Sequence, residues 1–318
     1  MKFKLRVFLV SISLIFISSQ AFAQELLRVG AGFAGTYPIF AAKLTDLINK
    51  NIDGYKAAAI KGNSNKALIE IDKGNMAYQI SYTWTVKQTA DGKSTIPVKA
   101  PSLCHIMTLY GSGFFAVSKK GGITNLSQLG SGKHRIWTGA KGGFFYNVLV
   151  PVLQAHGVDI EEIEKKGTIL ESFGYGDTVV AFQDRRLDAT FFSGGVPYSL
   201  MLRIENKPGF HLINWNDDAL KKLGELRPGI YPGLVPAGSY KGQDKDVKVP
   251  WYVNQLVTST KRPDDLTYQV TKIMNEKAKE FHGLFPGSEE IGVNDPLSHN
   301  LIPVCPGSAK YYKEKGLM

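Results

Sequence analysis

Residues 26–38 read Leu-Leu-Arg-Val-Gly-Ala-Gly-Phe-Ala-Gly-Thr-Tyr-Pro, and they predict a short strand, a glycine-rich turn and the start of a helix. Pro38 suits a first helical turn, where its missing N–H group would have no partner in any case. Apolar side chains recur at helical spacing over residues 36–51. The next expected elements are a strand at 55–60, a helix capped by Ser64 or Asn65, and a strand at 77–81. This order is typical of a mainly parallel α/β sheet.

The rest of the chain repeats this alternation. Strands are expected at residues 114–117, 134–138, 168–171, 187–192 and 251–258, and helices at 144–156, 176–186 and 266–281. A length of 318 residues suits two domains, because a domain usually holds roughly 100–200 residues. The composition, 43% hydrophobic and 21% charged, is that of a globular protein.

Two further strand-to-helix turns contain paired glycines, at residues 139–143 and 194–197. Glycine lets the backbone approach a ligand, and free N–H groups at a helix start favour an anion. In open α/β sheets, ligands sit at the carboxyl ends of strands. The three turns therefore predict a two-lobed cleft that holds a small anionic solute. The alternative is that each turn is merely a tight connection.

The first turn also matches the dinucleotide fingerprint, with glycines at Gly30, Gly32 and Gly35. That fingerprint needs an acidic residue at the end of the second strand to bind the ribose. Here Asp53 precedes that strand and Lys61 follows it. We therefore expect no nucleotide and no other cofactor.

The N-terminus has the pattern of a secretory signal peptide. Lys2, Lys4 and Arg6 precede a short apolar run, and Ala21-Phe22-Ala23 ends the segment. A membrane anchor is the alternative, but a span needs about 20 apolar residues and this run is shorter. We expect a signal peptide at residues 1–23, cleavage after Ala23, and a periplasmic protein.

Patterns of catalysis and of nucleic-acid binding are absent from the sequence. The six histidines lack metal-ligand spacing, and there is no Gly-x-Ser-x-Gly nucleophile turn. No acid–base pair can be assembled. The net charge of +10 comes from scattered cations rather than a dense basic run, so nucleic acid is not an expected partner. We expect a binding protein, not an enzyme, and no metal site.

The two cysteines, Cys104 and Cys305, admit two interpretations. In an oxidising compartment they form a disulfide that closes a very long loop, or they remain apart. Aromatic residues near the three turns are likewise candidates either for pocket walls or for the core: Phe33, Tyr37, Tyr82, Trp84, Phe144, Phe145, Tyr198 and Tyr240.

Four ordered motifs resemble those of TAXI-type solute-binding proteins, which serve tripartite ATP-independent periplasmic (TRAP) transporters. Residues 30–38 resemble the family's opening Gly-Thr-Gly-x-x-Gly-Thr-Tyr-Tyr-Pro turn, and residues 187–197 its Asp-Ala-x-Phe…Gly-Val-Pro segment. Residues 235–244, Val-Pro-Ala-Gly-Ser-Tyr-Lys-Gly-Gln-Asp, are close to its Pro-Ala-Gly-Thr-Tyr-Lys-Gly-Gln. Residues 306–312, Pro-Gly-Ser-Ala-Lys-Tyr-Tyr, resemble its closing motif.

The resemblance implies a type II periplasmic-binding-protein fold, in which two α/β lobes joined by crossing hinge strands close on a solute. Lobe one is expected at residues 24–114 and 249–318, and lobe two at 115–248. Family solutes are small carboxylates such as glutamate. A monomer that delivers the solute to TRAP membrane subunits is implied. The implied ligand contacts are Gly35, Thr36 and Tyr37 from lobe one, and Gly194, Gly195 and Val196 from lobe two.

This sequence departs from the family pattern at the second turn. The family's Gly-Ser-Gly-Thr aligns with Gly142-Gly143-Phe144-Phe145, and Lys141 adds a cation. Ser81 stands where a glutamine is common. These changes favour an anion with an apolar or aromatic part, and they add Ser81, Trp84, Lys141, Gly142, Gly143, Phe144 and Tyr240 to the candidate ligand-binding residues.

Two alternatives to a transport role remain. A ligand-sensing accessory protein of the same fold would present its closed form to a membrane receptor. An exported enzyme on this fold would need a titratable pair in the cleft.

Overall fold

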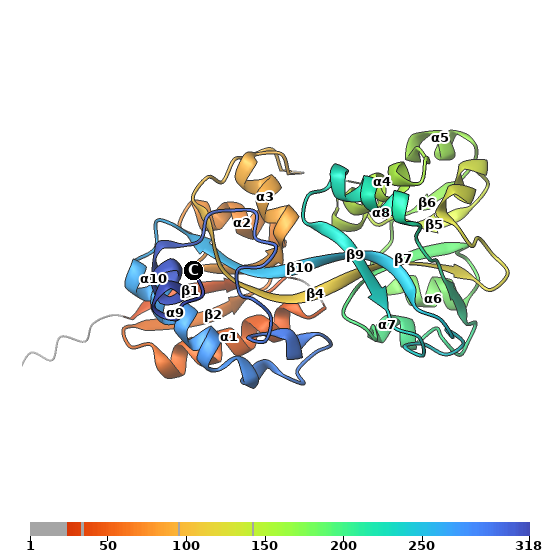
Figure 1. The fold of residues 1–318 in the computed structure, drawn as a ribbon. Coiled ribbons are helices and arrows are strands. Elements are labelled where there is room, and N and C mark those ends of the chain that lie inside the picture. Colours follow the sequence, from red (N-terminus) through yellow and green to blue (C-terminus); the bar gives the residue numbers. More distant parts are fainter. Residues whose placement is uncertain (1–23, 33–34, 95, 142) are drawn as a thin grey trace, which may run out of the picture.

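A computed structural model describes residues 24–32, 35–94, 96–141 and 143–318. Figure 1 shows two bodies of helices and strands side by side, joined by the long strands β4 and β10. We call them the first and the second lobe. The predicted signal peptide at residues 1–23 lies outside the described residues.

The first lobe contains both ends of the described chain. Its strands β1 and β2 are parallel, as are β1 and β3. Helices from the beginning and from the end of the sequence pack around them. The elements are β1 (Glu25–Gly30), α1 (Tyr37–Asn51), β2 (Tyr55–Ile60), α2 (Ser64–Asp72), β3 (Tyr78–Tyr82), α3 (Thr83–Asp91), α9 (Asp264–Glu276), η2 (Ala278–Phe281), η3 (Ser288–Glu290) and α10 (Pro306–Glu314).

The second lobe is formed by the middle of the chain. Strand β5 pairs in parallel with β6 and with β7. The elements are η1 (Leu126–Ser131), β5 (Arg135–Trp137), α4 (Phe144–Ala155), α5 (Ile160–Lys165), β6 (Ile169–Glu171), α6 (Asp177–Gln183), β7 (Ala189–Gly194), α7 (Ser199–Leu202), β8 (Phe210–Leu212), α8 (Asp217–Leu226) and β9 (Ile230–Val235).

One continuous sheet connects the lobes. Its order is β2-β1-β3-β10-β4-β7-β5-β6, with β4 (Leu103–Lys119) and β10 (Val247–Ser259) at the centre. The outer strands are parallel, but β10 runs antiparallel to β3 and β4, and β4 runs antiparallel to β7. The prediction of a mainly parallel sheet is therefore right for each lobe's outer strands and wrong for the centre. The reversal arises because β4 and β10 cross between the lobes in opposite directions.

The buried apolar side chains divide in the same way. One core contains Leu27, Phe40 and Tyr110 together with Leu256 and Phe281, so the two ends of the chain share it. The second lobe has its own cores, around residues such as Leu149, Phe191 and Trp215. The lobe boundaries at residues 114/115 and 248/249 stay a prediction.

Strand β4 begins eleven residues before the segment predicted as a strand, residues 114–117. All of its residues except the last are buried, including polar ones. His105 contacts Gln255 at 2.6 Å and the Pro296 carbonyl at 2.9 Å, and Thr108 donates to the Ser298 carbonyl at 2.7 Å. These partners come from distant parts of the chain, so no local pattern predicts their burial.

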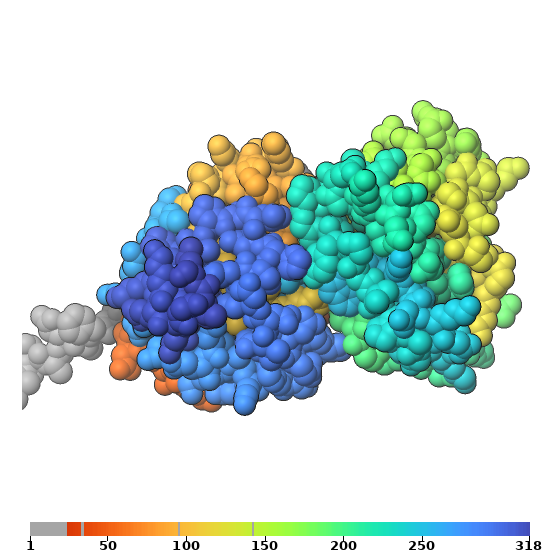
Figure 2. All heavy atoms as spheres, in the orientation of Figure 1, coloured from red at the N-terminus to blue at the C-terminus, as the bar shows by residue number. Residues whose placement is uncertain are grey.

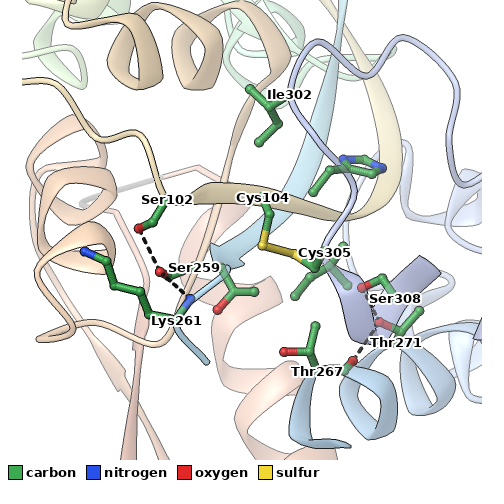
Figure 3. Close-up of a disulfide and its surroundings, with 12 residues drawn as sticks. Ser102, Cys104, Ser259, Lys261, Thr267, Thr271, Ile302, Cys305 and Ser308 are labelled. Atoms are coloured by element: carbon green, nitrogen blue, oxygen red, sulfur yellow. Dashed lines mark hydrogen bonds between the residues drawn. A yellow bond between two sulfur atoms is a disulfide. The ribbon is translucent and has the colours of Figure 1, made fainter. Parts of the chain in front are cut away.

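The disulfide between Cys104 and Cys305 ties β4 to the start of α10 across 201 residues. Figure 3 shows it within the first lobe, beside α9 and α10. The backbone N–H of Cys305 donates to the His105 carbonyl at 2.9 Å, and the His105 N–H donates to the Pro303 carbonyl at 2.8 Å. The last segment of the chain is therefore fixed to the central strand by a covalent bond and by backbone hydrogen bonds.

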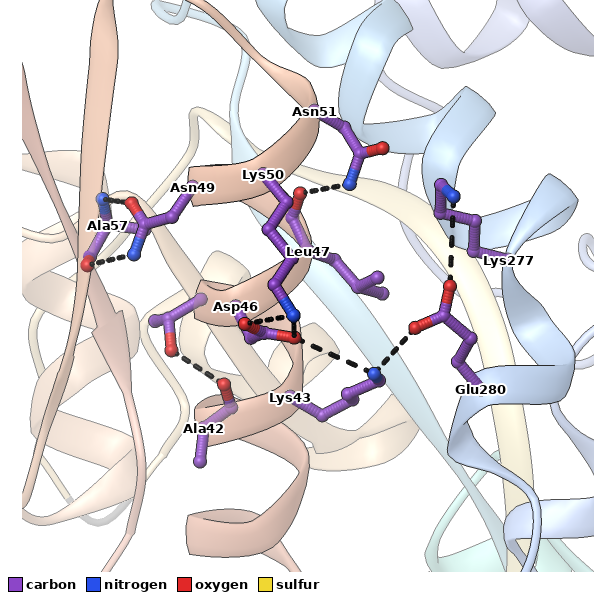
Figure 4. Close-up of polar contacts among 11 residues, drawn as sticks. Ala42, Lys43, Asp46, Leu47, Asn49, Lys50, Asn51, Ala57, Lys277 and Glu280 are labelled. Atoms are coloured by element: carbon purple, nitrogen blue, oxygen red, sulfur yellow. Dashed lines mark hydrogen bonds and ion pairs between the residues drawn. The ribbon is translucent and has the colours of Figure 1, made fainter.

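Polar contacts also hold α1 in place (Figure 4). The Asn49 side chain donates to the Ala57 carbonyl at 3.1 Å and accepts from its N–H at 2.7 Å, joining α1 to β2. Lys43 pairs with Glu280 at 2.6 Å, joining α1 to η2. These bonds fix the orientation of α1, whose first turn faces the other lobe.

Candidate functional site

A cavity of about 560 Å³ lies between the lobes, with walls from both. From the first lobe, the beginnings of α1, α2 and α3 contribute. From the second lobe, the beginning of α4 and the end of β7 contribute. The floor is formed by residues of the two connecting strands, Tyr110 and Ser112 in β4 and Asn254 in β10.

Four helices begin at this cavity. The N-cap residue of each helix lines the cavity: Thr36 for α1, Asn63 for α2, Tyr82 for α3 and Gly143 for α4. The first N–H groups of a helix have no partner within the helix, and its N-terminus carries a partial positive charge. Four such ends at one cavity make it a favourable place for an anion.

These four helices differ from most others in their first turns. None of α1 to α4 has an acidic residue there. Among the other α-helices of the described residues, α5, α6, α8 and α9 each have one or two, for example Glu161 and Asp217, whereas the short α7 and the disulfide-linked α10 have none. An acid in the first turn compensates the helix dipole. At the cavity the first turns of α1 to α4 supply no such compensation.

Lys141 is the one charged side chain among the described residues that line the cavity. It is exposed, and it forms no ion pair with any residue of the described ranges. The same walls contain no carboxylate and no histidine. The charge of the site is therefore positive.

Hydrogen bonds organise the floor. The Asn254 side chain donates to the Tyr110 carbonyl at 3.1 Å and to the Ser112 hydroxyl at 2.9 Å. Its carbonyl oxygen accepts from the Tyr37 hydroxyl at 3.1 Å. The Thr36 and Tyr110 hydroxyls lie 2.5 Å apart. The start of α1 is thus bonded to both connecting strands at the point where the lobes meet.

Aromatic rings cover the sides. Tyr82 stacks on Phe144 with ring centroids 4.9 Å apart, and Phe144 meets the edge of Phe145 at 5.1 Å. Phe145 in turn lies 4.5 Å from Tyr175. This wall gives the cavity an apolar side opposite its polar floor.

The phenols around the cavity are neutral at physiological pH. Burial raises the pKa of Tyr37, Tyr82, Tyr110 and Tyr175, and it raises that of Tyr198 to about 12. Their hydroxyl groups can therefore donate hydrogen bonds and bring no negative charge that would repel an anion.

The structure brings together most of the sequence-predicted ligand residues. Those that line the cavity are Gly35, Thr36, Tyr37, Ser81, Lys141, Gly143, Phe144 and Gly194. Gly142 lies outside the described residues.

The remaining four candidates lie behind or beside the cavity walls. Trp84 is 5% exposed and packs with core residues of the second lobe. Gly195 is buried against the first lobe, where an added Cβ would lie 2.5 Å from the Pro286 carbonyl oxygen. Val196 packs on the core of the second lobe. The Tyr240 hydroxyl accepts from the Tyr198 N–H at 2.7 Å and so supports a residue of the wall.

Sequence reasoning missed the residues of the floor. Tyr110, Ser112 and Asn254 lie within long strands, where nothing local distinguishes a cavity residue from a core residue. Asn63 was one position from the expected cap at residue 64 or 65, and its side chain accepts from the Lys66 N–H at 3.0 Å. The asparagine directly before an apolar helix was the available signal.

Two negative findings apply to the described part of the chain. It contains no group of histidine, cysteine, aspartate and glutamate side chains suited to a metal ion. None of its helices combines the length and the apolar character of a membrane span.

The chain is similar to known proteins both in its family profile and in its fold. The profile of the NMT1-like family matches residues 29–316. The binding protein component of an ABC phosphonate transporter from Pseudomonas aeruginosa has a TM-score of 0.51 and 14% identity, covering 80% of this chain and 75% of that one. A Xanthomonas citri protein solved with a chloride ion has a TM-score of 0.50 and 9% identity, covering 92% and 97%. At these identities the likeness concerns the fold alone, and it confirms the predicted periplasmic-binding-protein fold.

Proposed function

Because the chain belongs to the NMT1-like family, we propose that it is a periplasmic solute-binding protein that captures a small organic anion between its lobes. More narrowly, we propose a TAXI-type protein that works as a monomer and delivers its solute to the membrane subunits of a TRAP transporter. The support for this narrower assignment is the four sequence motifs given above, which occur in the family's order.

The observation that carries the proposal is the convergence of four helix N-termini on one cavity without acidic first turns. Lys141 adds a full positive charge there. Each helix end stabilises an anion by roughly 0.3–1 kcal/mol when exposed, and by more when partly buried. A carboxylate fits this set, because it accepts several N–H and O–H bonds at once.

The shape of the cavity extends the proposal to the rest of the solute. Its volume of about 560 Å³ falls in the range of roughly 300–1,000 Å³ that is typical of pockets for drug-sized ligands. The wall formed by Tyr82, Phe144 and Phe145 is apolar. We therefore favour a carboxylate with an apolar or aromatic part over glutamate itself.

The proposed ligand-binding residues are those that the sequence suggested and that line the cavity, together with the floor residues Tyr110, Ser112 and Asn254. Lys141, Gly143 and Phe144 would bind from the second lobe, and Thr36 and Tyr37 from the first. A solute that contacts both lobes stabilises the closed arrangement relative to the open one, and bending of β4 and β10 allows the exchange.

A thermal-shift screen tests the proposal. Protein lacking residues 1–23, refolded to remove bound solute, is melted with organic acids, amino acids, neutral sugars and amines. At one hundred times its dissociation constant, a ligand adds about 2.7 kcal/mol, which corresponds to a rise of roughly 4–5 °C at this chain length. We expect the hits among carboxylates. Hits confined to amines or neutral sugars would contradict the proposal.

A sensory role is the second candidate, because a closed two-lobed protein can also be recognised by a receptor. Uptake of the identified solute by cells with and without the cognate membrane subunits separates the two roles.

Catalysis is less well supported, since the described walls hold no carboxylate or histidine that could serve as acid or base. Conversion of a bound solute into product would overturn the assignment as a binding protein.

A further inference from the structure

A second, smaller cavity of about 180 Å³ adjoins the first. The two share three wall residues, Asn65, Thr85 and Phe144. We call it the side pocket. It lies between α3 and the loop that follows it on the first lobe, and α4 and the end of α8 on the second.

Two cations line the side pocket, one from each lobe. Lys93 lies just after α3, and Arg227 directly follows α8. Neither forms an ion pair with a carboxylate of the described chain, and no aspartate or glutamate lines the pocket. An anion between two cations is attracted by both of them, so a pocket with these two side chains in its wall favours an anion.

Arg227 is poorly satisfied in its present surroundings. Its Nη1 donates to the Leu226 carbonyl at 2.8 Å, while its Nε is buried and has no hydrogen-bond partner among the described residues. Burial lowers the pKa of the guanidinium group, which means that the charged form has lost part of its hydration. A partly desolvated guanidinium is stabilised most effectively by an acid group that accepts two of its N–H bonds.

Two uncharged side chains of the side pocket also lack partners. The indole N–H of Trp84 and the hydroxyl of Thr85 are buried and unpaired among the described residues, and each side chain is only 5% exposed. A buried donor without an acceptor costs about 1–3 kcal/mol. An acceptor in the side pocket that one of these donors reaches would remove its share of this cost.

The chain after Arg227 lies directly against α3. A Cβ on Gly229 would lie 3.1 Å from the Thr83 hydroxyl and 2.9 Å from the Leu301 side chain. Tyr231 stacks on His299 at 4.3 Å. Figure 2 shows the same face, where residues near the C-terminus abut those of the second lobe. The side pocket is therefore enclosed only while the lobes are together.

We propose that the side pocket binds a second anionic group between Lys93 and Arg227, with the indole N–H of Trp84 as a further donor. The group has two possible sources, the far end of a diacid held in the main cavity or a free inorganic anion. The first source rests on the proposed function, while the second does not. In both cases the anion links the lobes and favours the closed arrangement.

Two kinds of probe distinguish the sources. Two pairs of acids, each a monoacid and a diacid on the same skeleton, are titrated calorimetrically in phosphate-free buffer. They are valerate and glutarate, and 3-phenylpropionate and 3-(4-carboxyphenyl)propionate. Inorganic phosphate is tested separately by thermal shift. The variants are Arg227→Gln, Lys93→Gln and Trp84→Phe. Arg203→Gln is the matched control, because Arg203 is an exposed arginine of the second lobe that lines neither cavity.

If a diacid uses the side pocket, it binds more tightly than its monoacid, and Arg227→Gln weakens the diacid at least about tenfold while leaving the monoacid within about twofold. If a free anion uses it, phosphate raises the melting temperature of the wild type and of Arg203→Gln but not of Arg227→Gln. Trp84→Phe gives a smaller loss of diacid affinity, or of the phosphate-induced rise in melting temperature, than Arg227→Gln does. Melting of each variant without anion checks that it folds.

The inference is overturned if the Arg227 and Lys93 variants match the wild type in two measurements. One is the ratio of the monoacid and diacid dissociation constants, and the other is the rise in melting temperature that phosphate causes. That outcome with normal monoacid binding leaves the proposed function intact. Conversely, a phosphate shift that depends on Arg227, without binding of any acid, supports the side pocket and contradicts the proposed function.

Discussion

The ring of Tyr82, at the start of α3 in the first lobe, stacks on the ring of Phe144, at the start of α4 in the second, with centroids 4.9 Å apart and planes inclined by 30°. Both residues line the main cavity. The contact therefore joins the lobes at the place where the proposed solute would bind. It follows that the stability of the closed arrangement and the affinity for solute depend on some of the same atoms.

Replacing the phenyl ring at this contact is expected to weaken solute binding. An aromatic pair contributes about 0.5–1.5 kcal/mol beyond its buried area, so Phe144→Leu should raise the dissociation constant of the best carboxylate from the screen roughly 2- to 12-fold. Isothermal titration calorimetry measures the change. An affinity equal to that of the wild type would mean that the stacking does not assist closure.

Removal of the Lys141 charge is expected to reduce solute affinity more than the loss of the aromatic contact. If Lys141 pairs with a carboxylate, Lys141→Ala should weaken binding by well over tenfold, and Lys141→Gln by a similar factor. The effect should shrink at high ionic strength, since Lys141 is exposed. Lys222→Ala in α8 is the control, because that lysine lines neither cavity. Equal affinities of the Lys141 and Lys222 variants would remove Lys141 from the site.

A methyl group at position 195 should hinder closure. In the structure a Cβ on Gly195 would lie 2.5 Å from the Pro286 carbonyl oxygen of the other lobe, which is closer than such contacts tolerate. Gly195→Ala is expected to reduce solute affinity and to enlarge the radius of gyration in small-angle scattering. Gly176→Ala, where a Cβ meets nothing within 4 Å, should change neither. If both variants behave alike, the close approach has no effect on closure.

Loss of the disulfide should lower stability without altering binding directly. Both sulfurs are buried, and the bond closes a loop across 201 residues. Removal of a native disulfide is expected to cost roughly 2–4 kcal/mol of unfolding free energy. Denaturant melts of the double variant Cys104→Ser/Cys305→Ser check the value, and titration with solute checks that affinity is kept. A double variant as stable as the wild type would contradict the prediction.

Acid should destabilise the first lobe through His105. Burial lowers the pKa of this histidine, which is enclosed between Gln255 and the Pro296 carbonyl. The unfolded chain takes up a proton near pH 6.5 while the folded protein does not, so the free energy of unfolding falls as pH drops below about 6.5. His156, also with a pKa lowered by burial, acts in the same direction.

Denaturant melts at pH 7 and pH 5 measure this effect. His105→Gln keeps a polar side chain but cannot take up the proton, so its loss of stability between the two pH values should be smaller than that of the wild type. A single proton contributes at most about 1.4 kcal/mol per pH unit. An unchanged difference between the two pH values would show that His105 does not control the acid response.

Local patterns predicted several elements, including two of the helices that begin at the cavity. The strand at 55–60 has the predicted bounds, and α1 and α4 begin within one residue of the expected positions. These segments combine a regular apolar period with glycine or proline at their boundaries, and such signals are contained in neighbouring residues. The three glycine-containing turns predicted a single cleft, and the resemblance to TAXI-type proteins added Gly35, Thr36 and Tyr37 as its contacts.

The centre of the sheet could not be predicted in this way. In β4, buried His105 and Thr108 and the glycines at 111 and 113 interrupt the apolar pattern. Their environment is supplied by residues almost two hundred positions away. The side pocket was missed for the same reason, because Lys93 and Arg227 are far apart in sequence and look like surface cations until both lobes are in place.

The shared core of the first lobe also determines the order in which the protein can assemble. Its buried side chains come from residues 27–110 and 256–305, and the second lobe lies between these segments. A chain that emerges N-terminus first therefore supplies everything the second lobe needs before the first lobe can be completed. Cys104 must wait for Cys305, one of the last buried residues to arrive. The disulfide therefore cannot form until nearly the whole chain has been supplied, and a chain that ends before Cys305 cannot form it.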